Sequence, residues 1–223
     1  MNIKKLIVGA ATGAIVFGSL AASAFAESPR PHRPDVVVEE PASYVLNAEW
    51  VTGVSQDGGA KGQSLALGPD FAYYAFQNWW GHKLSDVTKV RASFMAGEDT
   101  VNLGGSPRFS LELDANGNGT FVEPTGNPAD EDVNVYLDPA LCGDQVADNW
   151  VEANFTGDRT NCTLNDSKGG VYTSDLQTTA WSKLVAEYPD AKVWFMFLIQ
   201  DATVGTNYVD RIMLDSAFFT KQP

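Results

Sequence analysis

The sequence predicts an all-β fold, an antiparallel β-sandwich with one short helix and one disulfide. Short apolar or alternating runs recur along the chain, and Gly, Asn, Asp and Pro separate them. One segment has apolar residues at helical spacing, and two cysteines are present. Many short strands at this spacing are typical of antiparallel sandwiches and barrels.

Strands are expected where β-branched or aromatic residues alternate with polar ones. In residues 87–96, Val90, Ala92, Phe94 and Ala96 fall on one face, which is the pattern of a half-buried strand. Residues 194–199 (WFMFLI) are apolar at every position, so we expect a central strand that is covered on both faces. The expected strands are 44–54, 71–79, 87–96, 107–114, 119–124, 133–138, 149–157, 192–202 and 207–219.

The helix is expected over residues 177–187. Trp181, Leu184, Val185 and Tyr188 have helical spacing, and Pro189 would end the helix. We expect it to cover one end or edge of the sandwich.

The N-terminal residues have the features of an export signal. Two lysines, an uncharged stretch and the small-x-small sequence Ala24-Phe25-Ala26 predict a cleaved signal peptide over 1–26. An uncleaved anchor is the alternative, because the apolar stretch is only a little shorter than a membrane span. Residues 27–42 hold four prolines among charged residues and predict a stiff spacer, which leaves 43–223 as the domain. The predicted mature chain is secreted and is not inserted into a membrane.

The charge and the cysteines narrow the function classes. The formal net charge of −13 becomes −15 when the two lysines of the signal peptide are removed, and no Lys/Arg cluster is present. Nucleic acid is therefore excluded as a partner, since its phosphates are bound by clustered cations. Cys142 and Cys162 are expected to pair, because exported chains meet an oxidising compartment.

A resemblance follows from a series of segments between about residues 63 and 215: AFQNWW, LSDVTKVRASFMA, PRFSLELDANGNGTFVEP, NWVEANF, WSKLVAEYPDAKV and NYVDRIML. Their order resembles a recurrent β-sandwich domain of exported bacterial proteins. It is similar in outline to the jelly-roll modules that bind carbohydrates, whose last strand often carries a Tyr-Val-Asp-Asn-Ile-like signature. This resemblance implies a jelly-roll-like topology. Arg211 stands where Asn is common in that signature, so no role is carried over to Asp210.

The stretch DANGNG could bind calcium. Asp114, Asn116 and Asn118 place oxygen ligands at every second residue, as at the start of an EF-hand loop. The twelfth position of such a loop is Thr125 rather than a bidentate acid. The alternative is a tight hairpin, in which Asn-Gly supplies the positive φ and 120–122 is the returning strand. The sequence indicates no required cofactor, and a structural Ca²⁺ ion is the candidate that this stretch suggests.

Glu112-Leu113-Asp114 resembles the opening of the Glu-x-Asp-x-Glu signature of laminarinase-like glycosidases. The second glutamate of the signature is replaced by Asn116 or, past a bulge, by Gly117. Unless another acid lies beside Glu112, the carboxylate pair for glycoside hydrolysis is absent. The scarcity of histidine disfavours Ser or Cys nucleophiles and zinc.

The aromatic residues favour a ligand with flat apolar faces and polar edges, such as a glycan. If the strand continues through Trp79 and Trp80, alternation exposes one of the two. Trp194 is expected in the core. The candidate ligand-binding residues are Tyr74, Trp79, Trp80, His82 and Trp150.

The sequence thus predicts a secreted, non-catalytic β-sandwich module that binds an extracellular ligand, a glycan first. The alternative is a structural or adhesive surface module whose partner is a protein. A laminarinase-like glycoside hydrolase is the third candidate.

Overall fold

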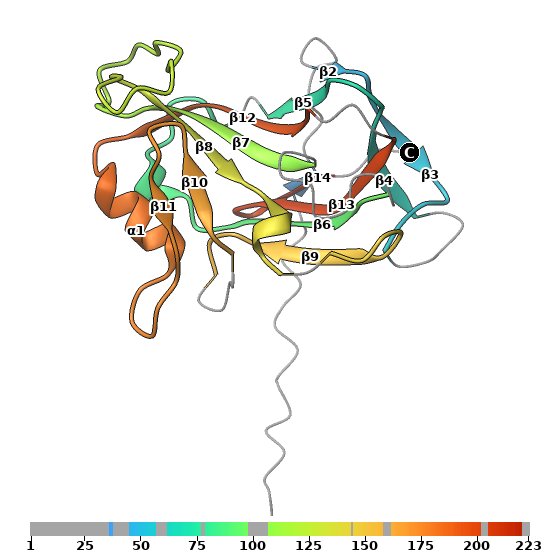
Figure 1. The fold of residues 1–223 in the computed structure, drawn as a ribbon. Coiled ribbons are helices and arrows are strands. Elements are labelled where there is room, and N and C mark those ends of the chain that lie inside the picture. Colours follow the sequence, from blue (N-terminus) through green and yellow to red (C-terminus); the bar gives the residue numbers. More distant parts are fainter. Residues whose placement is uncertain are drawn as a thin grey trace, which may run out of the picture. The chain divides into compact units, whose positions relative to one another are not determined.

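The computed structural model describes residues 36–37, 45–56, 62–76, 79–97, 107–143, 145–157, 162–201 and 205–219. Within this part of the chain, two seven-stranded sheets and one α-helix form a β-sandwich (Figure 1). The predicted fold class is confirmed. All strand pairs are antiparallel except β1 (Val36–Val37) with β14 (Ala217–Phe219), which is parallel.

The first sheet is built around β13 (Asn207–Leu214). One edge of β13 pairs with β6 (Val90–Met95), and β6 pairs in turn with β9 (Trp150–Asn154). Its other edge pairs with β4 (Gln63–Leu67) and with β14, and β4 also pairs with β3 (Ala48–Thr52).

The second sheet carries the candidate site. Its strand order is β11-β10-β8-β7-β12-β5-β2. The strands are β2 (Val45–Leu46), β5 (Ala72–Phe76), β7 (Arg108–Asp114), β8 (Val133–Leu137), β10 (Leu164–Asp166), β11 (Val171–Tyr172) and β12 (Lys192–Gln200). The longest strand, β12, therefore lies inside the sheet, between β7 and β5.

The core lies between the two sheets. Phe109 on β7 meets Phe94 on β6 with ring centroids 5.9 Å apart, and Phe76 on β5 meets Phe219 on β14 at 4.8 Å. The predicted inward face of β6 is confirmed, because Val90, Ala92 and Phe94 are all buried. Burial of such side chains stabilises the fold by about 1.5–3 kcal/mol each.

A β-bulge interrupts β12. Val193 pairs with Leu113 of β7, but the next pair is Phe195 with Glu112, so Trp194 is an extra residue. Val193, Met196 and Leu198 point into the core and are fully buried. The residues that alternate with them are only partly buried, namely Trp194, Phe195, Phe197 and Ile199. The expectations that this strand is covered on both faces and that Trp194 is a core residue are therefore wrong, because one face of β12 is open.

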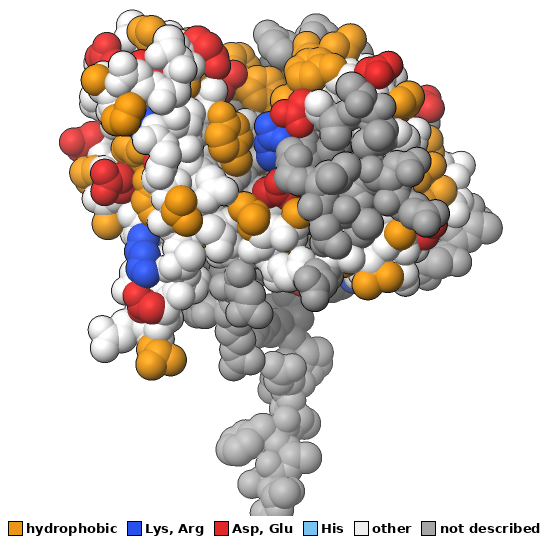
Figure 2. All heavy atoms as spheres, viewed as in Figure 1, with side chains coloured by type: hydrophobic (Ala, Val, Ile, Leu, Met, Phe, Trp, Pro, Cys, Tyr) orange, Lys and Arg blue, Asp and Glu red, His pale blue; other side chains and the backbone are white. Residues whose placement is uncertain are grey.

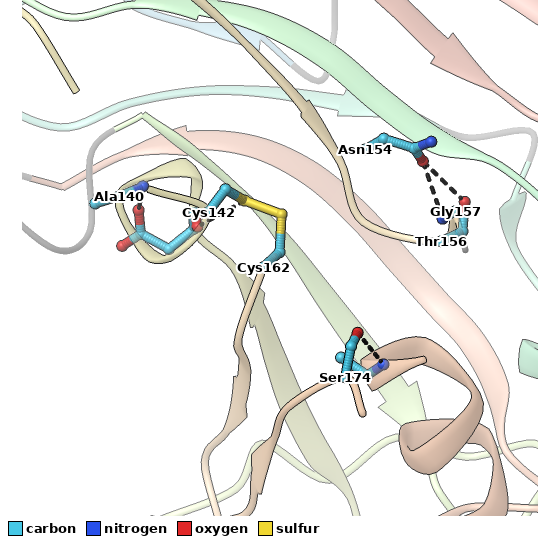
Figure 3. Close-up of a disulfide and its surroundings, with 9 residues drawn as sticks. Ala140, Cys142, Asn154, Thr156, Gly157, Cys162 and Ser174 are labelled. Carbon is cyan, nitrogen blue, oxygen red and sulfur yellow. Dashed lines mark hydrogen bonds between the residues drawn. A yellow bond between two sulfur atoms is a disulfide. The ribbon is translucent and has the colours of Figure 1, made fainter. Parts of the chain in front are cut away.

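The helix and the disulfide are present as predicted. Helix α1 (Ala180–Glu187) ends where expected and begins three residues later, because the Thr179 hydroxyl accepts the backbone N–H of Ser182 as an N-cap. It packs against β10 and β11 at one edge of the second sheet. The bond between Cys142 and Cys162 joins the end of a 3-10 turn (η4, Pro139–Leu141) to the segment before β10 (Figure 3).

Asp166 links β10, β11 and the end of α1 at one edge of the second sheet through hydrogen bonds. Its carboxylate accepts hydrogen bonds from the hydroxyls of Tyr172 at 2.6 Å and Tyr188 at 2.7 Å, and from the backbone N–H groups of Lys168 and Gly170. Burial raises the pKa of Asp166, but these four donors outweigh it and hold the pKa below its ordinary value. β10, β11 and the end of α1 thus share one buried anion.

The connection from β7 to β8 differs from the predicted tight hairpin. The returning strand is β8, and residues 115–132 between the two strands form a long loop. The predicted strand over 119–124 is therefore wrong. Gly117 and Gly119 do adopt the positive φ expected of this stretch, 70° and 89°. Four strands lie outside the strands expected from the sequence. These are β1 in the predicted spacer, and β4, β10 and β11 in short segments without clear alternation.

The predicted signal peptide lies outside the described residues, and so does the predicted spacer except for Val36–Val37, which form β1. Within the described ranges, no helix has the length and apolar character needed to cross a membrane.

Candidate functional site

A groove of about 440 Å³ lies on the open face of the second sheet. Strands β5, β12, β7 and β8 supply its floor, and the segment before β5 and the 115–132 loop supply Phe71 and Glu123. Figure 2 shows hydrophobic side chains beside acidic ones along the upper part of the described surface, over β2, β5 and β12. The lining residues are Phe71, Tyr73, Arg108, Ser110, Glu112, Glu123, Asn134, Tyr136, Phe197 and Ile199.

The apolar part of the groove is built on β12 and β5. The Phe197 ring meets Tyr73 edge-on at 6.0 Å, and Tyr73 meets Phe71 at 5.9 Å. Phe195 continues this row, with its ring 5.7 Å from that of Phe197. A row of aromatic rings on an open sheet face offers flat apolar surface to a ligand.

The bulge extends the aromatic surface beyond the groove. Trp194 stacks on Phe121 of the 115–132 loop at 6.2 Å and meets the exposed Trp80 edge-on at 5.9 Å. These contacts hold the loop against the sheet. The same loop carries Glu123 to the groove.

The polar part of the groove centres on Glu112, Glu123 and Asn134. Glu112 and Asn134 are cross-strand neighbours on β7 and β8. The side-chain N–H of Asn134 donates to the Glu123 carboxylate at 2.9 Å, and the buried Asn134 Oδ1 has no hydrogen-bond partner. Burial, and secondly the charge of Glu123, raise the pKa of Glu112 from 4.5 to about 7.

The cation of the groove is already paired. Both terminal nitrogens of Arg108 donate to the Asp201 carboxylate, at 2.8 and 2.7 Å, and the guanidinium lies 5.1 Å from the Tyr136 ring centroid. Burial raises the pKa of Tyr136, whereas the Arg108 charge acts in the opposite direction. Arg108 and Tyr136 are thereby fixed as one wall of the groove.

Backbone donors occupy the oxygens of the predicted metal ligands. The buried Asp114 carboxylate accepts the N–H groups of Asn118 at 3.0 Å and Gly119 at 2.7 Å. The side-chain oxygens of Asn116 and Asn118 accept N–H groups two residues ahead, and both side-chain amides donate to Glu131. No group of three His, Cys, Asp or Glu that could hold a metal ion occurs among the described residues. The geometry of the loop is that of a polar turn that satisfies its own backbone.

A second buried acid supports the same loop. The Asp132 carboxylate, which has no solvent exposure, accepts the N–H of Ala115 at 3.0 Å and that of Val122 at 2.6 Å. Val122 directly precedes Glu123, so Asp132 fixes the backbone next to the groove.

The structure does not bring the predicted ligand-binding residues together. Tyr74 and Trp79 are core residues, at 6% and 3% exposure. Trp80 is 63% exposed, so one of the two neighbouring tryptophans faces solvent, but β5 ends at Phe76 and strand alternation is not the reason. The exposed His82 lies beside Trp79. Trp150 is on β9, which belongs to the other sheet.

The sequence does not predict most of the groove residues as site residues. Glu112 belongs to the Glu-x-Asp motif, but Tyr73, Glu123, Tyr136 and Phe197 are not among the candidate site residues that the sequence predicts. One signal was present, since WFMFLI is apolar on both faces although an antiparallel sandwich strand usually buries only one. An open aromatic face is the other explanation of that pattern.

Comparison of the chain with protein-family models, curated proteins and solved structures finds no match. The resemblance to carbohydrate-binding jelly rolls therefore stays a prediction.

Proposed function

We propose that the protein is a secreted, non-catalytic module that binds a glycan in the groove on the open face of the second sheet. The observation that carries the proposal is the combination of aromatic rings and polar groups around one groove of ligand size. Tyr73 and Phe197 offer apolar surface for the C–H faces of a sugar ring, and Ser110 and Asn134 offer hydrogen bonds to its hydroxyl groups.

The structure supports a binding role for this face in a second way. Apolar side chains on an exposed strand face reduce solubility unless something covers them, and contiguous exposed apolar patches mark interaction sites. Phe71 is 49% exposed and Trp80 63%. Phe71 lines the groove, and Trp80 contacts Trp194, the residue that precedes Phe195 in β12.

The test is a binding screen of soluble and insoluble polysaccharides, followed by titration of the best ligand. We expect Tyr73→Ala and Phe197→Ala each to weaken binding by at least about tenfold, because stacked aromatic anchors dominate such sites. Trp150→Ala is the matched control, an aromatic substitution in the other sheet, and should leave affinity unchanged. Loss of binding in Trp150→Ala with retention in the groove variants would refute the proposal.

An adhesive module with a protein partner is the alternative. The exposed Trp80, which contacts Trp194, favours it, because exposed aromatic side chains are common anchors of protein interfaces. Capture of a defined surface protein that Trp80→Ala abolishes, with no polysaccharide bound, would favour this function.

Glycoside hydrolysis is the third candidate, and one observation favours it. The fold places Glu123 near Glu112, whose pKa of about 7 suits a general acid. The Glu-x-Asp signature itself does not contribute, since Asp114 accepts backbone N–H groups outside the groove. Release of reducing sugar that Glu112→Gln abolishes, with polysaccharide binding retained, would establish hydrolysis.

A further inference from the structure

The charges that line the groove do not cancel, because the cation is paired and two acids are not. Asp201 neutralises Arg108 through two hydrogen bonds. Among the described residues, neither Glu112 nor Glu123 forms an ion pair with a Lys or Arg side chain. The groove is therefore anionic whenever Glu112 is ionised.

The polar groups of the groove also offer more hydrogen-bond acceptors than donors. Ionised carboxylates only accept hydrogen bonds, and among the described residues Asn134 is the one side chain that donates to Glu123. Because the Asn134 N–H faces a carboxylate, its buried Oδ1 is left as an acceptor without a partner. A ligand that completes the groove must bring donors.

We propose that the ligand is an oligosaccharide that carries a free ammonium group, an amino sugar, and that this group binds between Glu112, Glu123 and Asn134. The inference rests on the proposed glycan-binding function. An ammonium group brings three donors and one positive charge, which matches the unpaired oxygens and the charge of the groove. The sugar ring would lie against Tyr73 and Phe197, and aromatic faces also attract a nearby cation.

The state of Glu112 separates this ligand from a neutral one. A neutral sugar would favour the protonated Glu112 carboxyl, which can donate to a hydroxyl group, so its binding would take up a proton near neutral pH. An ammonium group favours the ionised form, so its binding releases a proton. The other charged or titratable groups around Glu112 are Glu123 on the loop and the Arg108–Asp201–Tyr136 wall, and Arg108 is already paired.

The experiment compares three oligosaccharides of equal length, made of glucosamine, N-acetylglucosamine and glucose. Titration calorimetry at pH 6 in two buffers of different ionisation heat measures affinity and proton release together. We expect the glucosamine oligomer to bind at least about tenfold more tightly than the others, because it alone brings a positive charge to pair with the carboxylates. Its binding should release up to one proton.

Variants locate the ammonium group. Glu112→Gln and Glu123→Gln should each abolish the preference for glucosamine, and Glu112→Gln should also abolish proton release. Glu49→Gln, at an exposed position in the other sheet, is the control and should keep both.

The outcomes distinguish failure of the amino-sugar inference from failure of the glycan-binding function. Equal or tighter binding of the uncharged oligomers overturns the amino-sugar inference and leaves the glycan-binding function standing. Absence of binding by every oligomer and polysaccharide overturns both. A lysine tetramer that binds as tightly as the glucosamine oligomer moves the ligand class to basic peptides and also overturns the inference.

Discussion

The side-chain amide of Asn134 holds the carboxylate of Glu123 at 2.9 Å, and so places a loop residue beside the cross-strand neighbour of Asn134, Glu112. Two acids that are eleven positions apart in the sequence thereby act on each other in one groove. The consequences of this contact for proton binding, loop stability and ligand binding can be measured.

Substitution of Glu123 should change the pKa of Glu112. In Glu123→Gln we expect the pKa of Glu112 to fall from about 7 but to stay above 4.5, because burial is the larger cause of the shift and remains. Carbon-13 NMR titration of the side-chain carboxyl groups measures it directly. An unchanged pKa would mean that the two carboxylates do not interact. Glu49→Gln is the control and should leave the pKa of Glu112 unchanged.

Glu112 should make the folded state less stable as pH rises. Its folded pKa lies above its unfolded value, so the folded state holds more protons between pH 4.5 and about 7, and the free energy of unfolding falls as pH rises through that window. Glu112→Gln should therefore have a higher Tm than the wild type at pH 8 and a similar one at pH 4. The gain at pH 8 should be on the order of 1–2 kcal/mol, after allowance for screening at the open side of the groove. Equal Tm differences at both pH values would contradict the shift.

Removal of Asp132 should loosen the loop that carries Glu123. Asp132→Ala deprives the N–H groups of Ala115 and Val122 of a buried charged acceptor, so a loss of about 2–4 kcal/mol in the free energy of unfolding is expected. Urea unfolding measures the loss, and hydrogen exchange at Val122 should accelerate. Asp190→Ala, at an exposed position, should leave both unchanged.

Calcium should have no effect on stability if the 115–132 loop is a polar turn. Asp114, Asn116 and Asn118 already accept backbone N–H groups, so an ion would have to displace them. We expect the Tm to be the same in chelator and in millimolar calcium. A Tm that falls with chelator and recovers with calcium would instead establish the structural Ca²⁺ site that the sequence suggests.

Asp166 should stabilise the edge of the second sheet in a pH-dependent manner. Asp166→Ala should lower the free energy of unfolding at pH 7 by about 2–3 kcal/mol, because four donors lose a charged acceptor. The folded pKa is below the unfolded value of 3.8, so this stabilisation is present above about pH 4 and is lost as pH falls below it. The difference in Tm between variant and wild type should shrink in the same range. Glu187→Ala, an exposed acid on α1, is the control.

The sequence predicts what depends on neighbours along the chain. Alternation identified the buried face of β6, helical spacing identified α1, and the two cysteines identified the disulfide. Each of these needs only local periodicity or simple pairing. The all-β sandwich followed from the number and spacing of the short strands.

The groove depends on contacts between residues that are far apart in the sequence. The periodicity of the sequence does not predict such contacts. Whether the outer face of WFMFLI is covered or open depends on what packs above the sheet, so Phe197 could not be told from a core residue. Glu123 reaches the groove because the side chains of Asp114 and Asp132 hold a loop that looks like a tight turn in the sequence. Arg211 has a φ of 51°, a conformation that Asn adopts more readily than Arg.

The bulge in β12 also has a consequence for the evolution of the chain. Since Trp194 is the one unpaired residue between Val193 and Phe195, its deletion would leave a strand that alternates without interruption, with every flanking side chain on its present face. Deletion of Phe195 would have the same effect, whereas a single-codon deletion farther along the strand, for example of Leu198, would move neighbouring side chains to the opposite face. Positions 194 and 195 are thus where loss of one residue would keep both faces of the strand, and loss of Phe195 would also keep the contacts of Trp194 with Phe121 and Trp80.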